Sequence, residues 1–140
     1  MIDTNDISTL RKILKTNKVI AVIGLSAKWH RPSYFAAKYM QQYGYKIIPV
    51  NPSYDEILGE KCYPSLTEVE SRVDIVNCFR KSEDIEPLVP MAINSGAKVF
   101  WMQLGVANPL AKKKIINAGL QCVQNRCVKI EHARLFGGLN

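Results

Sequence analysis

The stretch VIAVIGLSAKWHRPS, residues 19–33, joins an unbroken apolar run to a glycine turn and then to a segment that begins like a helix. An apolar run of this length is typical of a strand covered on both faces of a parallel sheet. Gly24 lets the chain turn sharply, and Ser33 can cap the helix expected to follow. Together these features predict the first half of a βαβ unit.

The same alternation continues along the chain. Further short apolar runs predict strands at residues 46–50, 73–79, 98–102 and 120–123. Helical spacing of apolar residues marks segments 34–43, 85–95, 109–118 and 127–135. Glycines that suit a helix stop follow the first three of these segments, at Gly44, Gly96 and Gly119. We therefore expect an α/β fold, a three-layer sandwich of about five parallel strands with helices on both faces.

A further helix is predicted before the first strand, at about residues 4–16, with Asp3 or Thr4 as its cap. Its apolar stripe consists of Ile7, Leu10, Ile13 and Leu14. With a core at about residues 17–136, the whole chain of residues 1–140 is predicted to form one domain. Pro49 is unusual within a strand and is expected near the strand end or at a bulge.

Composition excludes several classes of protein. The chain has 140 residues, of which 47% are hydrophobic and 22% charged, so it is not a disordered polymer. No apolar run approaches the ~18 residues of a membrane span. Acidic residues stand near the start where a secretory signal is basic and then apolar, and we expect a cytoplasmic protein.

Metal binding is not predicted. Four cysteines and two histidines are present: Cys62, Cys78, Cys122, Cys127, His30 and His132. Without C-x-x-C spacing, the cysteines are expected to be free thiols, three of them in apolar surroundings. The formal net charge of +7 favours an anionic partner. Residues 112–114, three lysines, are expected on the solvated side of a helix.

Ligands of open α/β sheets bind beyond the carboxyl ends of the strands, where the strand order reverses. After the first strand, Ser26 offers a hydroxyl and Lys28 and Arg31 offer positive charge beside a helix start, which predicts an anion site. The turn has one glycine where a G-x-G-x-x-G fingerprint has three. Asn51 stands after the second strand where NAD sites carry an acid, so NAD is disfavoured.

The later strands add further candidates. Arg80 follows the third strand, where it either holds a phosphate or pairs on the surface with Glu83 or Asp84. Ser82 is predicted to begin the next helix. After the fourth strand, Gly105 permits close backbone approach and Asn108 is a plausible helix cap. Trp101 is expected in the core, because its neighbours are apolar.

An ordered set of motifs resembles a known family. The set comprises Gly24-x-Ser26, Arg31-Pro32-Ser33-Tyr34, Val50-Asn51-Pro52, Phe79-Arg80, Trp101-Met102-Gln103-x-Gly105 and Asn125-Arg126-Cys127. Over about residues 15–136 the chain resembles the small stand-alone CoA-binding proteins, which are similar to the nucleotide-binding domain of the succinyl-CoA synthetase alpha subunit. The resemblance implies a Rossmann-like fold that binds coenzyme A (CoA) or an acyl-CoA at the carboxyl edge of the sheet.

The resemblance also implies a set of site residues. These are Gly24, Leu25, Ser26, Lys28, Arg31, Pro32, Ser33, Tyr34, Asn51, Pro52, Phe79, Arg80, Gln103, Gly105, Asn125, Arg126 and Cys127. The diphosphate would lie on the glycine turn, the adenosine end would lie between residues 51–52 and 79–80, and pantetheine would pass Gly105 and residues 125–127. The family pattern usually reads Asp-Arg-Cys at the last motif, whereas this chain has asparagine at position 125.

We therefore expect a non-catalytic binding or sensing module for CoA, with a protein partner or a second copy as a further option. His132 has no serine or cysteine in a sequence relation that identifies a catalytic triad. Two alternatives remain open: an NAD(P)-binding oxidoreductase or redox sensor, and a nucleic-acid binder that uses the lysines at 112–114. Cys127 is either a packed cysteine at a helix start or a partner for a mixed disulfide with CoA.

Overall fold

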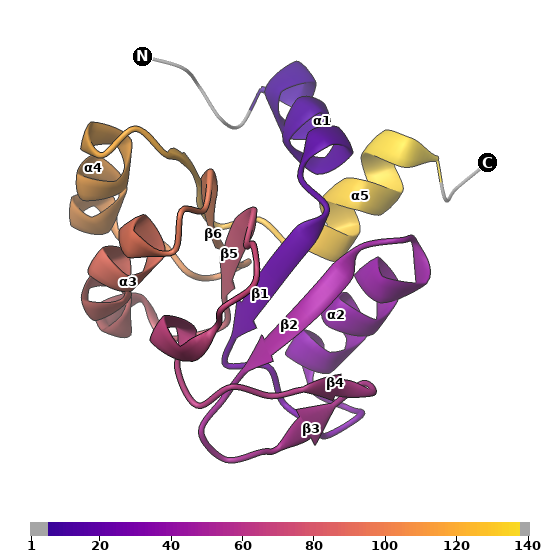
Figure 1. Ribbon diagram of the computed structural model, residues 1–140. Helices are drawn as coiled ribbons and strands as arrows, with labels where there is room; N and C mark the ends of the chain where they lie inside the picture. Colours follow the sequence, from indigo (N-terminus) through magenta and orange to yellow (C-terminus); the bar gives the residue numbers. More distant parts are fainter. Residues whose placement is uncertain (1–5, 138–140) are drawn as a thin grey trace.

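The computed structural model describes residues 6–137 and has a five-stranded parallel sheet at its centre (Figure 1). The strands are β1 (Val19–Ile23), β2 (Lys46–Val50), β5 (Ile75–Cys78), β6 (Val99–Met102) and β7 (Gln121–Val123). Their order across the sheet is β2-β1-β5-β6-β7, and every neighbouring pair is parallel. The predicted strands at residues 19–23 and 46–50 are confirmed to the residue.

Helices cover both faces of the sheet (Figure 1). One face carries α1 (Ile7–Thr16), α2 (Pro32–Gln42) and α5 (Val128–Phe136), and the other carries α3 (Val89–Asn94) and α4 (Pro109–Asn117). The predicted Rossmann-like α/β sandwich is thus confirmed. The cap predicted at Asp3 or Thr4 lies outside the described residues, and the observed N-cap of α1 is Asp6, so the helix begins later than predicted. Within residues 6–137, no helix has both the length and the apolarity needed to cross a membrane.

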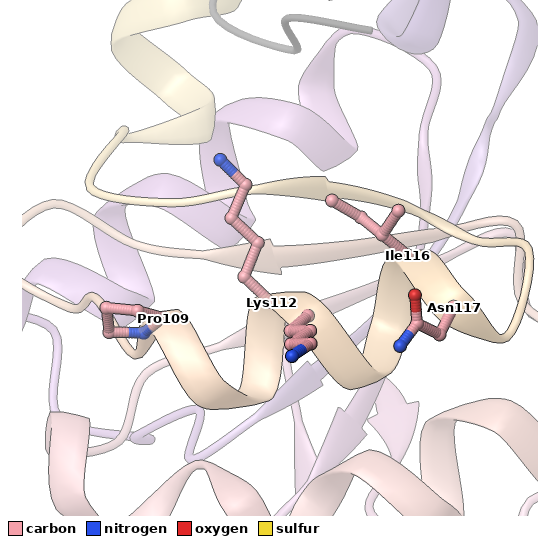
Figure 2. Close-up of a pocket in the computed structure, with 5 residues that line it drawn as sticks. Pro109, Lys112, Ile116 and Asn117 are labelled. Atoms are coloured by element: carbon pink, nitrogen blue, oxygen red, sulfur yellow. The ribbon is translucent and has the colours of Figure 1, made fainter. Parts of the chain in front are cut away.

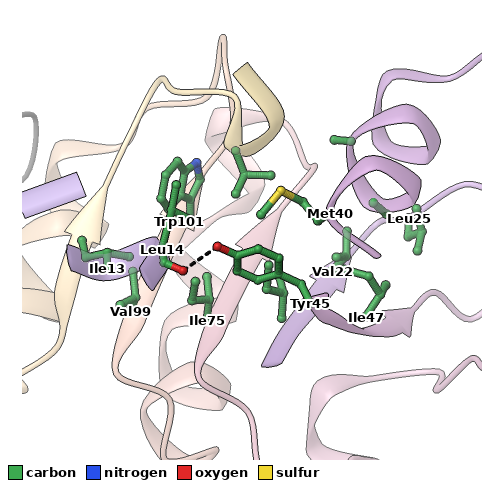
Figure 3. Close-up of a cluster of buried hydrophobic side chains, with 14 of the residues drawn as sticks. Ile13, Leu14, Val22, Leu25, Met40, Tyr45, Ile47, Ile75, Val99 and Trp101 are labelled. Carbon is green, nitrogen blue, oxygen red and sulfur yellow. Dashed lines mark hydrogen bonds between the residues drawn. The ribbon is translucent and has the colours of Figure 1, made fainter. Parts of the chain in front are cut away.

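Alternate residues of the strands build two cores. In β1, Ile20 and Val22 face α1, α2 and α5, whereas Ala21 and Ile23 face α3 and α4. Figure 3 shows the first core, in which the fully buried Trp101 lies among aliphatic side chains, as predicted. In the same core, the Tyr45 hydroxyl donates to the carbonyl oxygen of Leu14 and so ties the start of β2 to α1.

Pro49 lies one residue before the end of β2, which is an edge strand. Its carbonyl oxygen faces away from β1 and accepts a hydrogen bond from the Tyr63 amide at 3.0 Å. The missing N–H of Pro49 therefore lies on the outer side of the strand, and no hydrogen bond to β1 is lost.

Two segments differ from the prediction. The helix expected over residues 85–95 is α-helical only from Val89, after two 3₁₀ turns at Ser82–Asp84 and Glu86–Leu88. Pro87 and Pro90 lack amide donors, which favours short turns over a continuous α-helix. A small hairpin, β3 (Glu56–Ile57) with β4 (Glu60–Lys61), was not expected, and its turn uses Leu58 and Gly59 with positive φ.

The order of the strands locates the binding edge. From β1 the chain first moves to β2 on one side and later returns to β5 on the other side. The loops that follow β1 and β5 consequently diverge in opposite directions above the sheet, and this is where open α/β sheets bind ligands.

Candidate functional site

Gly24 and Phe79 follow the two neighbouring strands β1 and β5 and meet at the point where the strand order reverses. Gly24 has a φ of +86°, and a Cβ built on it would lie 2.4 Å from the Phe79 carbonyl oxygen. The guanidinium carbon of Arg80 would lie 3.5 Å from the same Cβ. Only glycine fits this turn, because any side chain would collide with backbone.

The turn after β1 is held by hydrogen bonds of its own. The Gly24 amide donates to the Val50 carbonyl at 2.9 Å, and the Ser26 amide donates to the Ser33 hydroxyl oxygen at 3.0 Å. The Ser26 hydroxyl oxygen accepts from the Lys28 amide at 3.1 Å. Three amides that an anion would otherwise use are therefore occupied.

The predicted cap at Ser33 is wrong. Arg31 is the N-cap of α2, Pro32 stands at the first helical position, and Ser33 is buried in the first turn. The Ser33 hydroxyl oxygen accepts from the Ser26 amide in the preceding loop, and α2 has no side-chain cap bond. Within residues 6–137, the amides of Leu25, Ala27 and Ser33 have no backbone acceptor, and of these three residues only Ala27 is exposed.

A cleft of about 280 Å³ opens over this turn. We call it the switch-point cleft, and it is lined by Gly24, Ser26, Lys28, Arg31, Pro32, Ser33, Tyr54 and Phe79. Lys28 and Arg31 are exposed at its rim, so their charge is available without a large desolvation cost. Tyr54 was not anticipated from the sequence. The only sequence feature that could have indicated Tyr54 is the turn at Asn51-Pro52, which returns the chain toward the cleft.

Asn51 supports the turn through its side chain. The Asn51 Nδ2 donates to the Leu25 carbonyl at 3.0 Å, and its Oδ1 accepts from the Ser53 amide at 2.9 Å. The side-chain amide thus bridges the loops after β1 and β2. Pro52 is exposed beside it, and neither residue lines the switch-point cleft.

Arg80 is half-buried at the end of β5. Among residues 6–137, no ion pair joins Arg80 to Glu83 or Asp84, the surface alternative raised by the sequence. Its guanidinium stays close to Gly24, where it adds positive charge to the turn. Ser82, predicted to cap a helix, instead accepts a hydrogen bond from the Ala107 amide at 3.1 Å.

Farther along the same edge, the loops after β6 and β7 are tied together. The Gly105 amide donates to Asn125 Oδ1 at 2.8 Å, and the Asn125 amide donates to the Val106 carbonyl at 2.9 Å. Asn125 has a φ of +58°, a conformation that asparagine tolerates better than most residues. Cys127 is the half-buried N-cap of α5, and Arg126 lies 3.8 Å from the buried Glu131.

Leu25, Tyr34 and Gln103, also predicted as site residues, do not line the switch-point cleft. Leu25 is fully buried in the core, Tyr34 packs against that core, and Gln103 is 2% exposed. The predicted site thus divides into the switch-point cleft and the separate loop pair 103–106 and 124–127.

The buried thiols show no sign of reactivity. Burial raises the pKa of Cys62 and of Cys78, and raises the pKa of Cys122 to about 12. Each of these three thiols is therefore protonated at neutral pH, in line with the apolar surroundings that were predicted. Within the described part of the chain, no group of three or more His, Cys, Asp or Glu side chains could hold a metal ion.

A larger depression of about 430 Å³ lies along the outer surface of α4 (Figure 2). It is lined by Pro109, Lys112, Lys113, Ile116 and Asn117. Asn108 caps this helix as predicted, since its side chain accepts from the Ala111 amide at 3.0 Å. Every lining residue belongs to one helix, so the depression lacks the converging loops of the switch-point cleft, and we place the candidate site at the cleft.

Comparisons with known proteins identify the family of the chain. A family model described as CoA binding domain matches residues 18–133. Protein YneT of Bacillus subtilis, which carries the description uncharacterized, is 41% identical over 124 residues, or 89% of this chain and 92% of that protein. The solved structure of a hypothetical protein from Pyrococcus horikoshii is 42% identical with a TM-score of 0.91, covering 94% of this chain and 93% of the other.

A larger protein shares part of the chain. An ADP-forming acetate–CoA ligase of Methanocaldococcus jannaschii is 39% identical over 64 residues, which make up 46% of this chain and 9% of the ligase. Similarity over almost the full length is therefore found with small proteins, whereas the ligase shares one short region.

Proposed function

The chain belongs to the CoA binding domain family, and from that premise we propose that it binds coenzyme A or an acyl-CoA at the carboxyl edge of its sheet. In this proposal the protein is a binding or sensing module with no catalysis of its own. It would act in the cytoplasm and present or report CoA to a protein partner or a second copy.

The observation that supports this proposal best is the switch-point cleft. It lies where parallel α/β sheets bind ligands, and its lining includes the tight turn at Gly24, which packs against the Phe79 carbonyl oxygen. Lys28 and Arg31 border the cleft and Arg80 lies beside Gly24, so positive charge surrounds it. The diphosphate and 3′-phosphate of CoA are the complementary anion.

The hydrogen bonding of the turn decides how the phosphates would be held. Because Gly24, Ser26 and Lys28 use their amides internally, fewer backbone donors face a ligand than in a glycine-rich phosphate loop. Charged side chains must then supply most of the attraction, and Arg80 can do so with two parallel N–H bonds. In the proposed arrangement, pantetheine runs from this turn past Gln103 and Gly105 toward residues 125–127.

The two alternative functions, NAD(P) binding and nucleic-acid binding, gain no support from the structure. An NAD site would need an acid after β2, and the asparagine found there is engaged with the Leu25 carbonyl and the Ser53 amide. A nucleic-acid footprint at residues 112–114 is reduced because Lys114 pairs with Glu86 at 2.9 Å.

Titration calorimetry with CoA and dephospho-CoA tests the proposal. We expect both ligands to bind, with Arg80→Ala and Lys28→Ala each weakening CoA by about 1.5–3 kcal/mol, the usual contribution of a charge-assisted contact. Lys113→Ala is the matched control, since it removes one lysine from α4 outside the cleft. The absence of CoA binding, or an equal loss in the Lys113 variant, would refute the proposed site.

A further inference from the structure

Asn77 is a polar side chain in the middle of the apolar sheet. It lies in β5, is 1% exposed, and has Val22 of β1 and Trp101 of β6 as its neighbours across the ladders. Burying an amide among apolar side chains costs free energy unless its hydrogen bonds are made. The position of Asn77 therefore calls for a partner.

That partner is Gln103, which follows β6 and is 2% exposed. Gln103 Nε2 donates to Asn77 Oδ1 at 2.6 Å. The backbone of Gln103 is also fixed, because its amide donates to the Cys78 carbonyl at 3.3 Å and its carbonyl accepts from the Val106 amide at 2.8 Å. The two side chains form a rigid amide pair between adjacent strands.

The pair leaves one amide nitrogen and one amide oxygen without a hydrogen bond. Within residues 6–137, Asn77 Nδ2 donates to no acceptor and Gln103 Oε1 accepts from no donor. Yet every fully inaccessible side-chain nitrogen or oxygen of the described residues has a hydrogen-bond partner. The two unused atoms are therefore not completely inaccessible, and each keeps a hydrogen-bonding position without a partner in the described part of the protein.

The pair also lies between the two ends of the candidate site. On one side, Phe79 follows Asn77 by two residues and meets Gly24. On the other, the Trp101 indole nitrogen donates to the Arg126 carbonyl at 2.7 Å, beside the loop that contains Asn125 and Cys127. A ligand that extends from the phosphate turn to that loop passes the carboxyl ends of β5 and β6, where the amide pair is found.

We propose that Asn77 and Gln103 recognise the amides of the pantetheine arm, with Asn77 Nδ2 donating to an amide carbonyl and Gln103 Oε1 accepting from an amide N–H. This inference rests on the proposed binding of CoA and assigns the non-nucleotide half of the ligand to specific atoms. Pantetheine offers both groups that the pair lacks, whereas the nucleotide half offers no such amide.

The test compares CoA with 3′-phosphoadenosine 5′-diphosphate, which lacks pantetheine, by titration calorimetry. The variant is the double substitution Asn77→Leu and Gln103→Leu, because replacing both members of a buried pair with apolar groups of similar shape preserves folding best. Asn17→Leu is the matched control. Asn17 is also a buried asparagine, but it precedes β1 at the opposite edge, where its Nδ2 donates to the Ile13 carbonyl.

We expect the double variant to bind CoA about ten- to a hundredfold more weakly, the loss of two neutral hydrogen bonds, and to bind the nucleotide half as the unsubstituted protein does. Circular dichroism verifies that the variant is folded. An equal loss for both ligands would make the pair purely structural and overturn the inference. Unchanged CoA affinity would overturn it as well, while leaving the proposed function intact. If the unsubstituted protein binds neither ligand, the proposed function itself fails and the inference fails with it.

Discussion

At the scale of single residues, Gly24 is the position that the site tolerates least. Its positive φ and its approach to the Phe79 carbonyl oxygen are separate obstacles to any side chain. We expect Gly24→Ala to lower the free energy of unfolding by about 3 kcal/mol. Gly44→Ala is the control: φ is +92° there, but nothing lies within 4 Å of the added Cβ.

Strain from the positive φ alone should lower the free energy of unfolding of the Gly44→Ala variant by about 1 kcal/mol. Urea unfolding of both variants separates strain from collision. Equal losses in the two variants would mean that the turn at Gly24 adjusts and that the close approach to Phe79 does not matter.

At the same scale, the roles of some side chains could not be predicted from the sequence. Ser33 and Ser82 both stand where helix caps are expected, yet each hydroxyl accepts from a distant amide, at Ser26 and Ala107. Tertiary hydrogen bonds of this kind have no local signal. Asn108 differs because its side-chain oxygen accepts from an amide in the first turn of its own helix. This cap was predicted correctly.

At the scale of elements, the start of α4 depends on that cap. Asn108 also donates through Nδ2 to the Ser82 carbonyl at 3.0 Å and so joins α4 to the loop after β5. Asn108→Ala should lower the free energy of unfolding by about 1 kcal/mol. Arg31→Ala is the control, since Arg31 is an N-cap without a side-chain cap bond, and it should change stability by less than about 0.5 kcal/mol. Thermal or urea unfolding that ranks the two variants the other way would contradict this assignment.

The packing of α5 against α2 should make the stability of the protein depend on pH. His132 is buried, its Nδ1 lies 2.9 Å from the Tyr39 hydroxyl oxygen, and Tyr43, Tyr45 and Phe136 surround its ring. Burial, assisted by the charge of Lys18, lowers the pKa of His132 below its ordinary value of 6.5. Below that value the unfolded chain takes up a proton that the folded protein does not, so acid favours unfolding.

We therefore expect the free energy of unfolding to decrease as pH falls from about 7 toward about 5. His132→Phe removes the titrating group from an aromatic cluster and should flatten this decrease. His30→Gln, at an exposed position, should keep the slope of the unsubstituted protein. A His132 variant that retains the full slope would assign the pH dependence to other groups.

At the scale of the whole molecule, the sheet was predictable because its strands lie in short, mostly apolar runs that contrast with the helical spacing of the segments between them. The residues of β1 and β2 follow from that contrast alone. The order of the strands does not, since periodicity carries no information about neighbours. Residues on one loop, such as Ser26 and Arg31, could be grouped from sequence, whereas Tyr54 joins them only through the fold. The role of each predicted site residue in binding CoA stays a prediction.

The net charge of +7 gives a further expectation for the molecule as a whole. Attraction between exposed cations and a phosphorylated ligand is screened by salt, over about 10 Å at 0.1 M. CoA affinity should therefore fall as sodium chloride is raised, and dephospho-CoA, with one phosphate fewer, should show a shallower dependence. Identical salt dependence for the two ligands would place the 3′-phosphate outside the cationic rim.

Native mass spectrometry of the full chain, as purified and after addition of micromolar CoA, tests the central claim most directly. A complex heavier than the protein by one CoA or acyl-CoA, which weakens in the Arg80→Ala variant, is the result we predict. A spectrum that contains the unliganded protein alone under both conditions would contradict the assignment of this chain as a CoA-binding module.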